Sequence, residues 1–286
     1  MSDEPNAAPL LYPPGHFYSP VVNPRDVEER ARTIWPETPE VLGVDFRPHE
    51  HQRILTEVFP RFIGDYRYAE SESHTKAPYE YYTRNPQFSW LDSRALFVFL
   101  RELRPRRVVE VGSGFSSLLT ADVNRRFFDE QIVFECIDPY PQSFLEGEVP
   151  GLTNLVREPA QKTDIAFFTR LEAGDILFID SSHVAKTGSD VNFLFFEVFP
   201  RLAPGVRVHV YAVFLPEEYP RSWVAEENRS WNEQYLLRAF LMYSTGFRVM
   251  FGSNYALHRF PELVSTALGR AGKPAFGGGS FWIERV

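Results

Sequence analysis

Two glycines stand between a short apolar stretch and a second apolar segment in this chain. The residues run Arg107-Val108-Val109-Glu110-Val111-Gly112-Ser113-Gly114-Phe115-Ser116-Ser117. Gly112 and Gly114 permit backbone dihedrals and close approaches that a Cβ would obstruct, so a bulky ligand can lie against the main chain at the end of a strand. Ser117 stands where the dinucleotide fingerprint has its third glycine, which disfavours a nicotinamide cofactor. The pattern therefore predicts a nucleotide-binding turn of another kind.

Acidic residues accompany this turn and follow two further apolar stretches. Asp138 comes directly after Ile132–Ile137, where a carboxylate can accept hydrogen bonds from both hydroxyls of a ribose. Asp180 ends the apolar stretch 176–179. Glu110 lies inside the first predicted strand, where its carboxylate can sit under a cationic or amine-bearing part of a ligand. The spacing predicts that these acids gather at one edge of a parallel sheet.

Three motifs resemble, in this order, those of class I S-adenosylmethionine-dependent methyltransferases. They are Val109-Glu110-Val111-Gly112-Ser113-Gly114, Ile137-Asp138-Pro139 and Ile176-Leu177-Phe178-Ile179-Asp180-Ser181-Ser182-His183. The chain is similar to small bacterial members with a strand-end Asp-x-x-His motif, over roughly Asp92 to Val286. The resemblance implies S-adenosylmethionine as cofactor, with S-adenosylhomocysteine as product. The expected cofactor-binding residues are Glu110, Gly112, Ser113, Gly114, Ser116, Asp138, Gln161 and Asp180, although Gln161 is as well explained as an exposed loop residue.

Four residues are candidates for the chemistry itself. His183 lies three residues beyond Asp180, and its imidazole, with an ordinary pKa of about 6.5, can take a proton from a substrate hydroxyl. His209 is the second choice of base, although its place in an alternating strand also suits the core. The resemblance places Asp180 close to the donor amine or the methyl-transfer centre, with helix capping as the alternative. Tyr211 either positions a substrate or packs at a strand end.

The fifth predicted strand ends in an unusual pair, Tyr211-Ala212. Chains that resemble this one commonly carry His-Asp there, as part of a metal or acid-base site. Alanine can neither ligate a cation nor move a proton, and loss of one hard oxygen ligand weakens divalent-ion binding. The sequence therefore predicts no metal site.

Composition excludes several classes of partner. The 286 residues carry a formal net charge of −8, which argues against nucleic acid and anionic membranes. We find no run of 18 apolar residues and no secretory signal, and we expect a cytoplasmic protein. Cys136 is the only cysteine, within an apolar strand, which excludes an internal disulfide and predicts a buried, inert thiol.

The chain divides near Asp92. Residues 1–91 are rich in proline and aromatic residues and are expected to form an extension and cap packed on the core, with helices over 24–34 and 49–59. The cluster Tyr79–Tyr82 is interpreted either as an aromatic flap over the site or as packing. Residues 92–286 are expected to form the S-adenosylmethionine-binding domain, a Rossmann-like α/β fold with a seven-stranded, mostly parallel sheet and helices on both faces. Strands are predicted over 108–111, 132–137, 152–156, 175–179, 206–214, 247–251 and 280–284, and helices over 93–103, 116–128, 165–171, 191–199 and 232–243.

Three functional hypotheses follow. The first is metal-independent methyl transfer from S-adenosylmethionine to a small-molecule hydroxyl or amine, with an aromatic or apolar acceptor and a role in secondary metabolism. The second keeps the cofactor site but replaces transfer by a cyclisation or rearrangement, because of Ala212. The third is a catalytically inactive binding partner that retains the fold. A homo-oligomer is compatible with all three.

Overall fold

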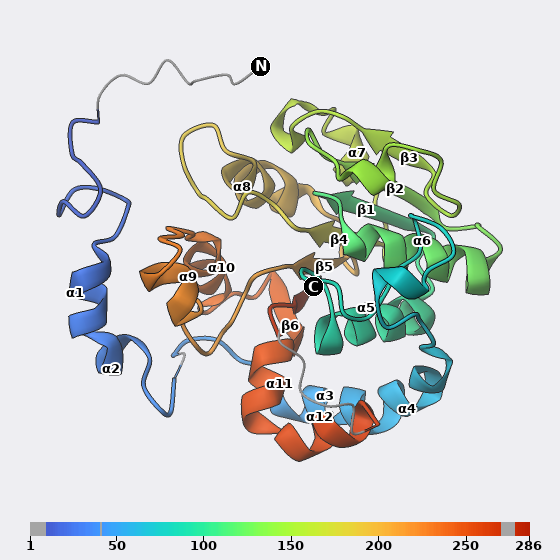
Figure 1. Cartoon of the computed structure of the whole chain (residues 1–286), viewed down its shortest axis with the longest axis horizontal. Helices are drawn as coiled ribbons and strands as arrows, with labels where there is room; N and C mark the ends of the chain where they lie inside the picture. Colours follow the sequence, from blue (N-terminus) through green and yellow to red (C-terminus); the bar gives the residue numbers. More distant parts are fainter. Residues whose placement is uncertain (1–9, 41, 270–277) are drawn as a thin grey trace.

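A seven-stranded sheet forms the centre of the protein (Figure 1). The computed structural model describes residues 10–40, 42–269 and 278–286. The strand order is β3-β2-β1-β4-β5-β7-β6; β7 runs antiparallel to both neighbours, and the other neighbouring pairs are parallel. The predicted α/β fold class is thereby confirmed. The strands are β1 (Arg107–Val111), β2 (Val133–Ile137), β3 (Asn154–Val156), β4 (Ile176–Ile179), β5 (Arg207–Val210), β6 (Phe247–Gly252) and β7 (Phe281–Arg285).

The central strands are apolar because both faces of the sheet are covered. Side chains alternate between the faces, so Phe178 of β4 joins one apolar cluster while Leu177 and Ile179 join the other. Helices α5 and α6 pack on the first face together with α4, α11 and α12. Helices α7, α8 and α10 pack on the second face.

The α-helices are α1 (Pro24–Glu29), α2 (Ala31–Ile34), α3 (Pro48–Arg53), α4 (Phe59–Phe62), α5 (Trp90–Leu103), α6 (Phe115–Phe128), α7 (Ala166–Thr169), α8 (Asp190–Phe193), α9 (Arg221–Ala225), α10 (Glu233–Leu241), α11 (Ser253–Arg259) and α12 (Pro261–Ala267). Two π-helical turns, η1 (Ile54–Val58) and η6 (Leu194–Val198), continue α3 and α8. Short 3₁₀ turns are η2 (Ile63–Asp65), η3 (Glu72–His74), η4 (Ser143–Leu145), η5 (Ala160–Lys162) and η7 (Phe199–Arg201).

Two parts of the fold differ from the expectation. The fifth strand ends at Val210 rather than at residue 214, because Ala212 has φ +55° and turns the chain out of the sheet. Helices α9, α11 and α12 were not predicted. They are short, with five to seven residues each, so their apolar periodicity spans too few turns to stand out.

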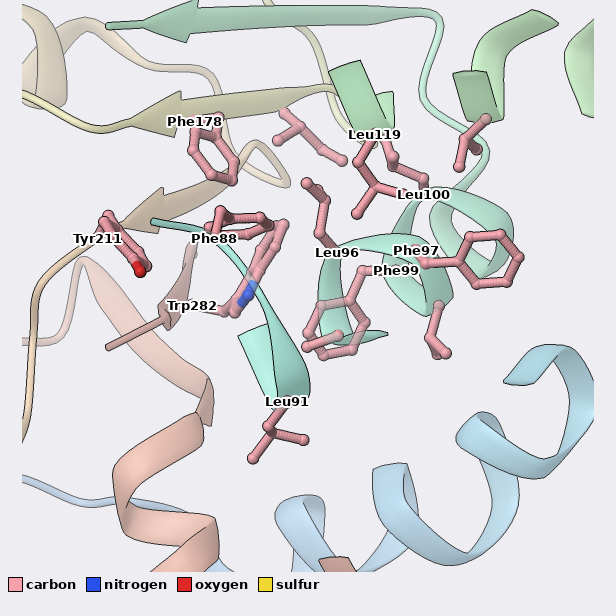
Figure 2. Packing of buried hydrophobic residues seen from close by; sticks show 14 of the residues in the cluster. Phe88, Leu91, Leu96, Phe97, Phe99, Leu100, Leu119, Phe178, Tyr211 and Trp282 are labelled. Atoms are coloured by element: carbon pink, nitrogen blue, oxygen red, sulfur yellow. The ribbon is translucent and has the colours of Figure 1, made fainter. Parts of the chain in front are cut away.

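Residues on both sides of position 91 share one core. Ile54 and Phe59 from the N-terminal segment are buried in the same cluster as Leu96 of α5. Figure 2 shows Phe88 beside Phe178, Tyr211 and Trp282, with ring centroids 5.8 Å from Phe178 and 5.4 Å from Tyr211. The segment before α5 therefore fills space against the strands, directly below the edge where the predicted site residues lie.

Within residues 10–40, 42–269 and 278–286, no helix has both the length and the apolar character that a bilayer crossing requires.

Candidate functional site

A cavity of about 710 Å³ opens at the carboxyl ends of β1, β2, β4 and β5. The strand order reverses between β1 and β4, which is where open α/β sheets bind their ligands. The volume suits a ligand the size of a nucleoside with a second small molecule. The wall consists of Pro86, Gln87, Val111, Gly112, Ser113, Ile137, Asp138, Pro139, Tyr140, Gln142, Pro159, Ala160, Gln161, Asp180, Ser181, Ser182, His183, Lys186, Gly188, Ser189, Asp190, Tyr211, Ala212, Trp223, Arg229 and Trp231.

The turn after β1 has room for glycine alone at its first position. Gly112 has φ +85°, and a Cβ placed on it would clash with the main-chain carbonyl oxygen of Asp180. The clash arises because β1 and β4 continue side by side past their last paired residues. The amide of Asp180 donates to the carbonyl of Val111 at 2.8 Å. Glycine at position 112 thus lets the turn after β1 pack directly against the main chain of Asp180.

Behind this turn lies a buried polar cluster that does not reach the cavity wall. Glu110 is 1% exposed, and its carboxylate accepts a hydrogen bond from Ser116 Oγ at 2.5 Å. Burial raises the pKa of Glu110 to about 8, more than these hydrogen bonds lower it. The amide of Gly114 donates to Ser117 Oγ at 3.0 Å at the start of α6. Glu110, Gly114 and Ser116 therefore brace the turn, whereas Gly112 and Ser113 line the cavity.

Asp138 lies on the cavity wall, fixed from two sides. Ser113 Oγ donates to its Oδ2 at 2.6 Å, and the amide of Tyr140 donates to its Oδ1 at 2.7 Å. Each oxygen keeps a second lone pair for a ligand. Gln161 is also on the wall, and its Nε2 donates to the carbonyl of Gly188 at 3.3 Å, which joins the loops after β3 and β4.

The loop after β4 holds a histidine between two carboxylates. His183 Nε2 lies 3.2 Å from Asp180 Oδ1, and Nδ1 lies 2.9 Å from Glu233 Oε2. Burial alone would lower the pKa of His183, but its bonds to Asp180 and Glu233 outweigh burial and raise the pKa to about 10. At neutral pH the ring is therefore an imidazolium that donates from both nitrogens.

This geometry changes the interpretation of His183. A general base must be unprotonated and must direct a free nitrogen at the substrate. Both nitrogens of His183 are engaged, so the expectation of a free base above the cleft is corrected. Asp180 and His183 both line the cavity, but the side chain of Asp180 is 35% exposed and that of His183 only 8%, so Asp180 is the more accessible of the two.

His209 does not join the site. Its ring is fully buried, stacked on Phe178 at 3.8 Å and 4.8 Å from Trp282. Nε2 lies 2.9 Å from Ser280 Oγ, and burial holds the pKa of His209 well below its usual value. The expectation that His209 is a reserve base is corrected because its strand position points to the core.

Tyr211 and Ala212 both line the cavity. The Tyr211 hydroxyl donates to the main-chain carbonyl of Gln87, so it ties the segment before α5 to the end of β5. Ala212 adopts a left-handed backbone, which is unusual for a residue with a Cβ. Its methyl group occupies the wall position where an acid was expected in relatives.

The aromatic wall of the cavity comes from a segment that the sequence did not single out. Trp223 and Trp231 line it, and the guanidinium of Arg229 lies over both indole rings at 4.2 and 4.8 Å. Of the two interpretations of the cluster Tyr79–Tyr82, packing holds for Tyr81, which is 2% exposed and whose hydroxyl donates to the carbonyl of Phe88 at 2.9 Å. The two tryptophans close together after β5 were the available signal.

Glu233 is a further site residue that sequence reasoning missed. It lies at the start of α10, far along the chain from Asp180 and His183, and is 1% exposed.

No grouping of three or more His, Cys, Asp or Glu side chains suited to a metal ion occurs within residues 10–40, 42–269 and 278–286.

Comparison with known proteins gives this geometry a context. Residues 109–210 match the family model of a methyltransferase domain. An uncharacterized protein of Archaeoglobus fulgidus is 38% identical over 166 residues, which cover 57% of this chain and 74% of that protein.

Among solved structures, a candidate methyltransferase from Thermobifida fusca YX aligns with a TM-score of 0.42 at 12% identity, covering 91% of this chain and 87% of that one. A DUF574 family protein from Streptomyces avermitilis MA-4680 aligns with a TM-score of 0.37 at 12% identity, covering 68% and 80%. On the evidence of sequence, the chain belongs to the family of the Archaeoglobus fulgidus protein, and its residues 109–210 match the model of a methyltransferase domain.

Proposed function

We propose that the protein transfers a methyl group from S-adenosylmethionine to a hydroxyl or amine of a small molecule, without a metal ion. The observation that carries the proposal is the cavity at the carboxyl ends of β1, β2 and β4, inside a methyltransferase domain. When bound, S-adenosylmethionine supplies an electrophilic methyl group on its sulfonium. The residues present fit this molecule in two respects.

The first respect is close approach to the main chain. Gly112 lines the cavity directly after β1, so a ligand there meets main-chain atoms rather than a side chain at this position. The second is hydrogen bonding. Asp138 directs a carboxylate at the wall, held by Ser113 and Tyr140, and its remaining lone pairs suit the two hydroxyls of a ribose. Gln161 lies on the same wall and suits the edge of a base.

On the acceptor side, Asp180 orients the incoming group and takes its proton. His183 donates to Oδ1 of Asp180, which leaves the second carboxylate oxygen for the acceptor's O–H or N–H. Holding the acceptor in one orientation is the main contribution expected of such a site, because a bimolecular step then becomes effectively unimolecular. The proton lost by the acceptor passes to Asp180.

The aromatic part of the cavity wall favours a flat or apolar acceptor. Tyr211, Trp223 and Trp231 present rings there, and Pro86 adds an apolar surface from the segment before α5. Metal independence is supported by Ala212, which places a methyl group on the wall and offers no oxygen ligand.

The test is turnover with labelled S-adenosylmethionine in the presence of a chelator, using a panel of small phenols and aromatic amines. We expect labelled product and S-adenosylhomocysteine in equal amounts. Asp180→Asn should lose most turnover and keep cofactor binding, whereas Asp164→Asn, on an exposed loop outside the cavity wall, should behave as the wild type. Equal turnover of the Asp180→Asn variant would contradict the assigned role.

A second candidate keeps the cofactor site and replaces transfer by a cyclisation or rearrangement. Two observations favour it: both ring nitrogens of His183 are engaged, and the side chain of Ala212 has no group that can accept a proton. Product formed without S-adenosylhomocysteine would support this candidate over methyl transfer.

A further inference from the structure

Residues at the N-terminus of α10 form hydrogen bonds with the loop that carries His183. The amides of Asn232 and Glu233 donate to the carbonyl of His183 at 3.0 and 3.2 Å, and Asn232 Oδ1 accepts from the amide of Ala185 at 2.6 Å. His183 has φ +59°, a left-handed conformation that is costly for a residue with a Cβ. The surrounding contacts must hold this conformation, and α10 supplies several of them.

The side chain of Glu233 also contacts the side chain of His183. Its Oε2 accepts from His183 Nδ1 at 2.9 Å and from Ser181 Oγ at 2.9 Å. Its Oε1 is buried and has no hydrogen-bond partner within the described part of the chain. A buried carboxylate keeps its charge at low cost only beside a cation, and His183 is the titratable cation that Glu233 contacts.

Two carboxylates and one indole ring lie against the His183 ring. Asp180 faces Nε2 from the end of β4, Glu233 faces Nδ1 from α10, and the Trp231 ring lies at 4.3 Å with a tilt of 40°. The ring thus links a buried carboxylate on one side to the carboxylate on the cavity wall on the other.

We infer that Glu233 is a positioning residue of the active site: it holds His183 in the orientation and charge state in which Nε2 donates to Asp180, so that Asp180 presents its second oxygen to the acceptor. The inference rests on the proposed methyl transfer for its catalytic consequence. Glu233 lies outside the matched methyltransferase domain of residues 109–210. The acceptor side therefore depends on a helix that follows that domain in the chain.

The test compares Glu233→Gln with Glu226→Gln, an exposed position shortly before it that loses the same charge. Glutamine keeps the size and can still accept a hydrogen bond from Nδ1, so the variant isolates the charge. The first measurement is the titration of the His183 imidazole by nuclear magnetic resonance, assigned with a His183→Gln variant. We expect wild-type His183 to remain protonated at pH 8 and to lose its proton at a pH at least one unit lower in Glu233→Gln.

Two further measurements separate this inference from the proposed function. Affinity for S-adenosylhomocysteine should be unchanged in Glu233→Gln, while kcat/KM for transfer should fall by roughly 10- to 100-fold and its pH profile should shift. An unchanged His183 titration in Glu233→Gln, or a wild-type His183 that titrates near its ordinary pKa, would overturn the inference. Absence of cofactor binding in the wild type would instead overturn the proposed function and would leave the His183 measurement intact.

Discussion

The two halves of the cavity are built in different ways. The half proposed to bind the cofactor, called the cofactor half below, consists of Gly112, Ser113 and Asp138, which follow β1 and β2 directly, and Ser113 Oγ donates to Asp138. The half proposed to bind the acceptor is called the acceptor half. The acceptor half joins Asp180 and His183 to Gln87, to Tyr211 and to the segment 223–233. One half is set by strand ends within a single sheet edge, and the other by contacts between distant segments. This difference suggests that the cofactor half is fixed by the fold while the acceptor half is open to variation.

The largest effect is expected from Gly112→Ala in the cofactor half. The new Cβ would meet the carbonyl of Asp180, and alanine would be strained at φ +85°. We expect the free energy of unfolding to fall by about 3 kcal/mol, with loss of cofactor binding, measured by urea denaturation and calorimetry. Gly64→Ala, where a Cβ meets nothing within 4 Å, is the matched control: it should leave cofactor binding unchanged and raise the free energy of unfolding by about 0.4–1 kcal/mol. Wild-type behaviour of Gly112→Ala would show that the turn is not packed as described.

Asp138→Asn should act on the cofactor half alone. Removing the charge weakens hydrogen bonds to ribose hydroxyls, and bonds to charged groups contribute about 1.5–3 kcal/mol. S-adenosylhomocysteine affinity should fall by roughly 10- to 100-fold, while the His183 titration stays as in the wild type. Glu158→Gln, an exposed residue outside the cavity wall, is the charge-matched control. A shifted His183 titration in Asp138→Asn would mean that the two halves are coupled.

The pH dependence of stability should report the acceptor half. The pKa of His183 is raised from 6.5 to about 10 on folding, so its stabilising contribution is fully present below pH 6.5 and is lost as the pH rises towards 10. We expect the difference in unfolding free energy between the wild type and His183→Gln to shrink steadily across that window. Taking the difference removes the contribution of Glu110, whose raised pKa also lowers stability as the pH rises from 4.5 towards 8. A pH-independent difference would contradict the paired imidazolium.

The smallest effect is expected at the boundary between the halves, from Ala212→Gly. Glycine relieves the left-handed backbone at φ +55° but adds entropy to the unfolded chain. We expect a net gain of about 0.5 kcal/mol in unfolding free energy. Ala166→Gly, at an exposed helical position in α7, should instead lose stability by about 0.5–1 kcal/mol. A loss of stability in Ala212→Gly would show that this backbone is not strained.

The sequence predicted the cofactor half better than the acceptor half, for a physical reason. Parallel strands end at one edge of a sheet, so Gly112, Asp138 and Asp180 could be placed together from the ends of apolar stretches alone. The same pattern located every strand of the sheet, and the fifth was overextended because Ala212 turns the chain without a glycine or proline to mark it.

The acceptor half could not be derived in this way. The contact between His183 and Glu233 joins residues 50 positions apart, and it depends on how α10 packs beside β4 rather than on any local pattern. The orientation of His209 also could not be predicted from the sequence. Its alternation within β5 was visible, but the face to which it points was decided by packing against Phe178 and Trp282. Tyr81 is likewise buried in the cluster that contains α5, and Tyr79 and Tyr82 pack against that cluster while partly exposed.

Calorimetric titration of S-adenosylhomocysteine into chelator-treated protein, repeated with magnesium, tests the central claim most directly. The cavity geometry predicts micromolar binding without metal and the same affinity with magnesium, because Asp138 and the Gly112 turn are complete without an ion. Binding that appears only with magnesium would contradict metal independence. The absence of binding in both conditions would contradict the assignment of the cavity to S-adenosylmethionine.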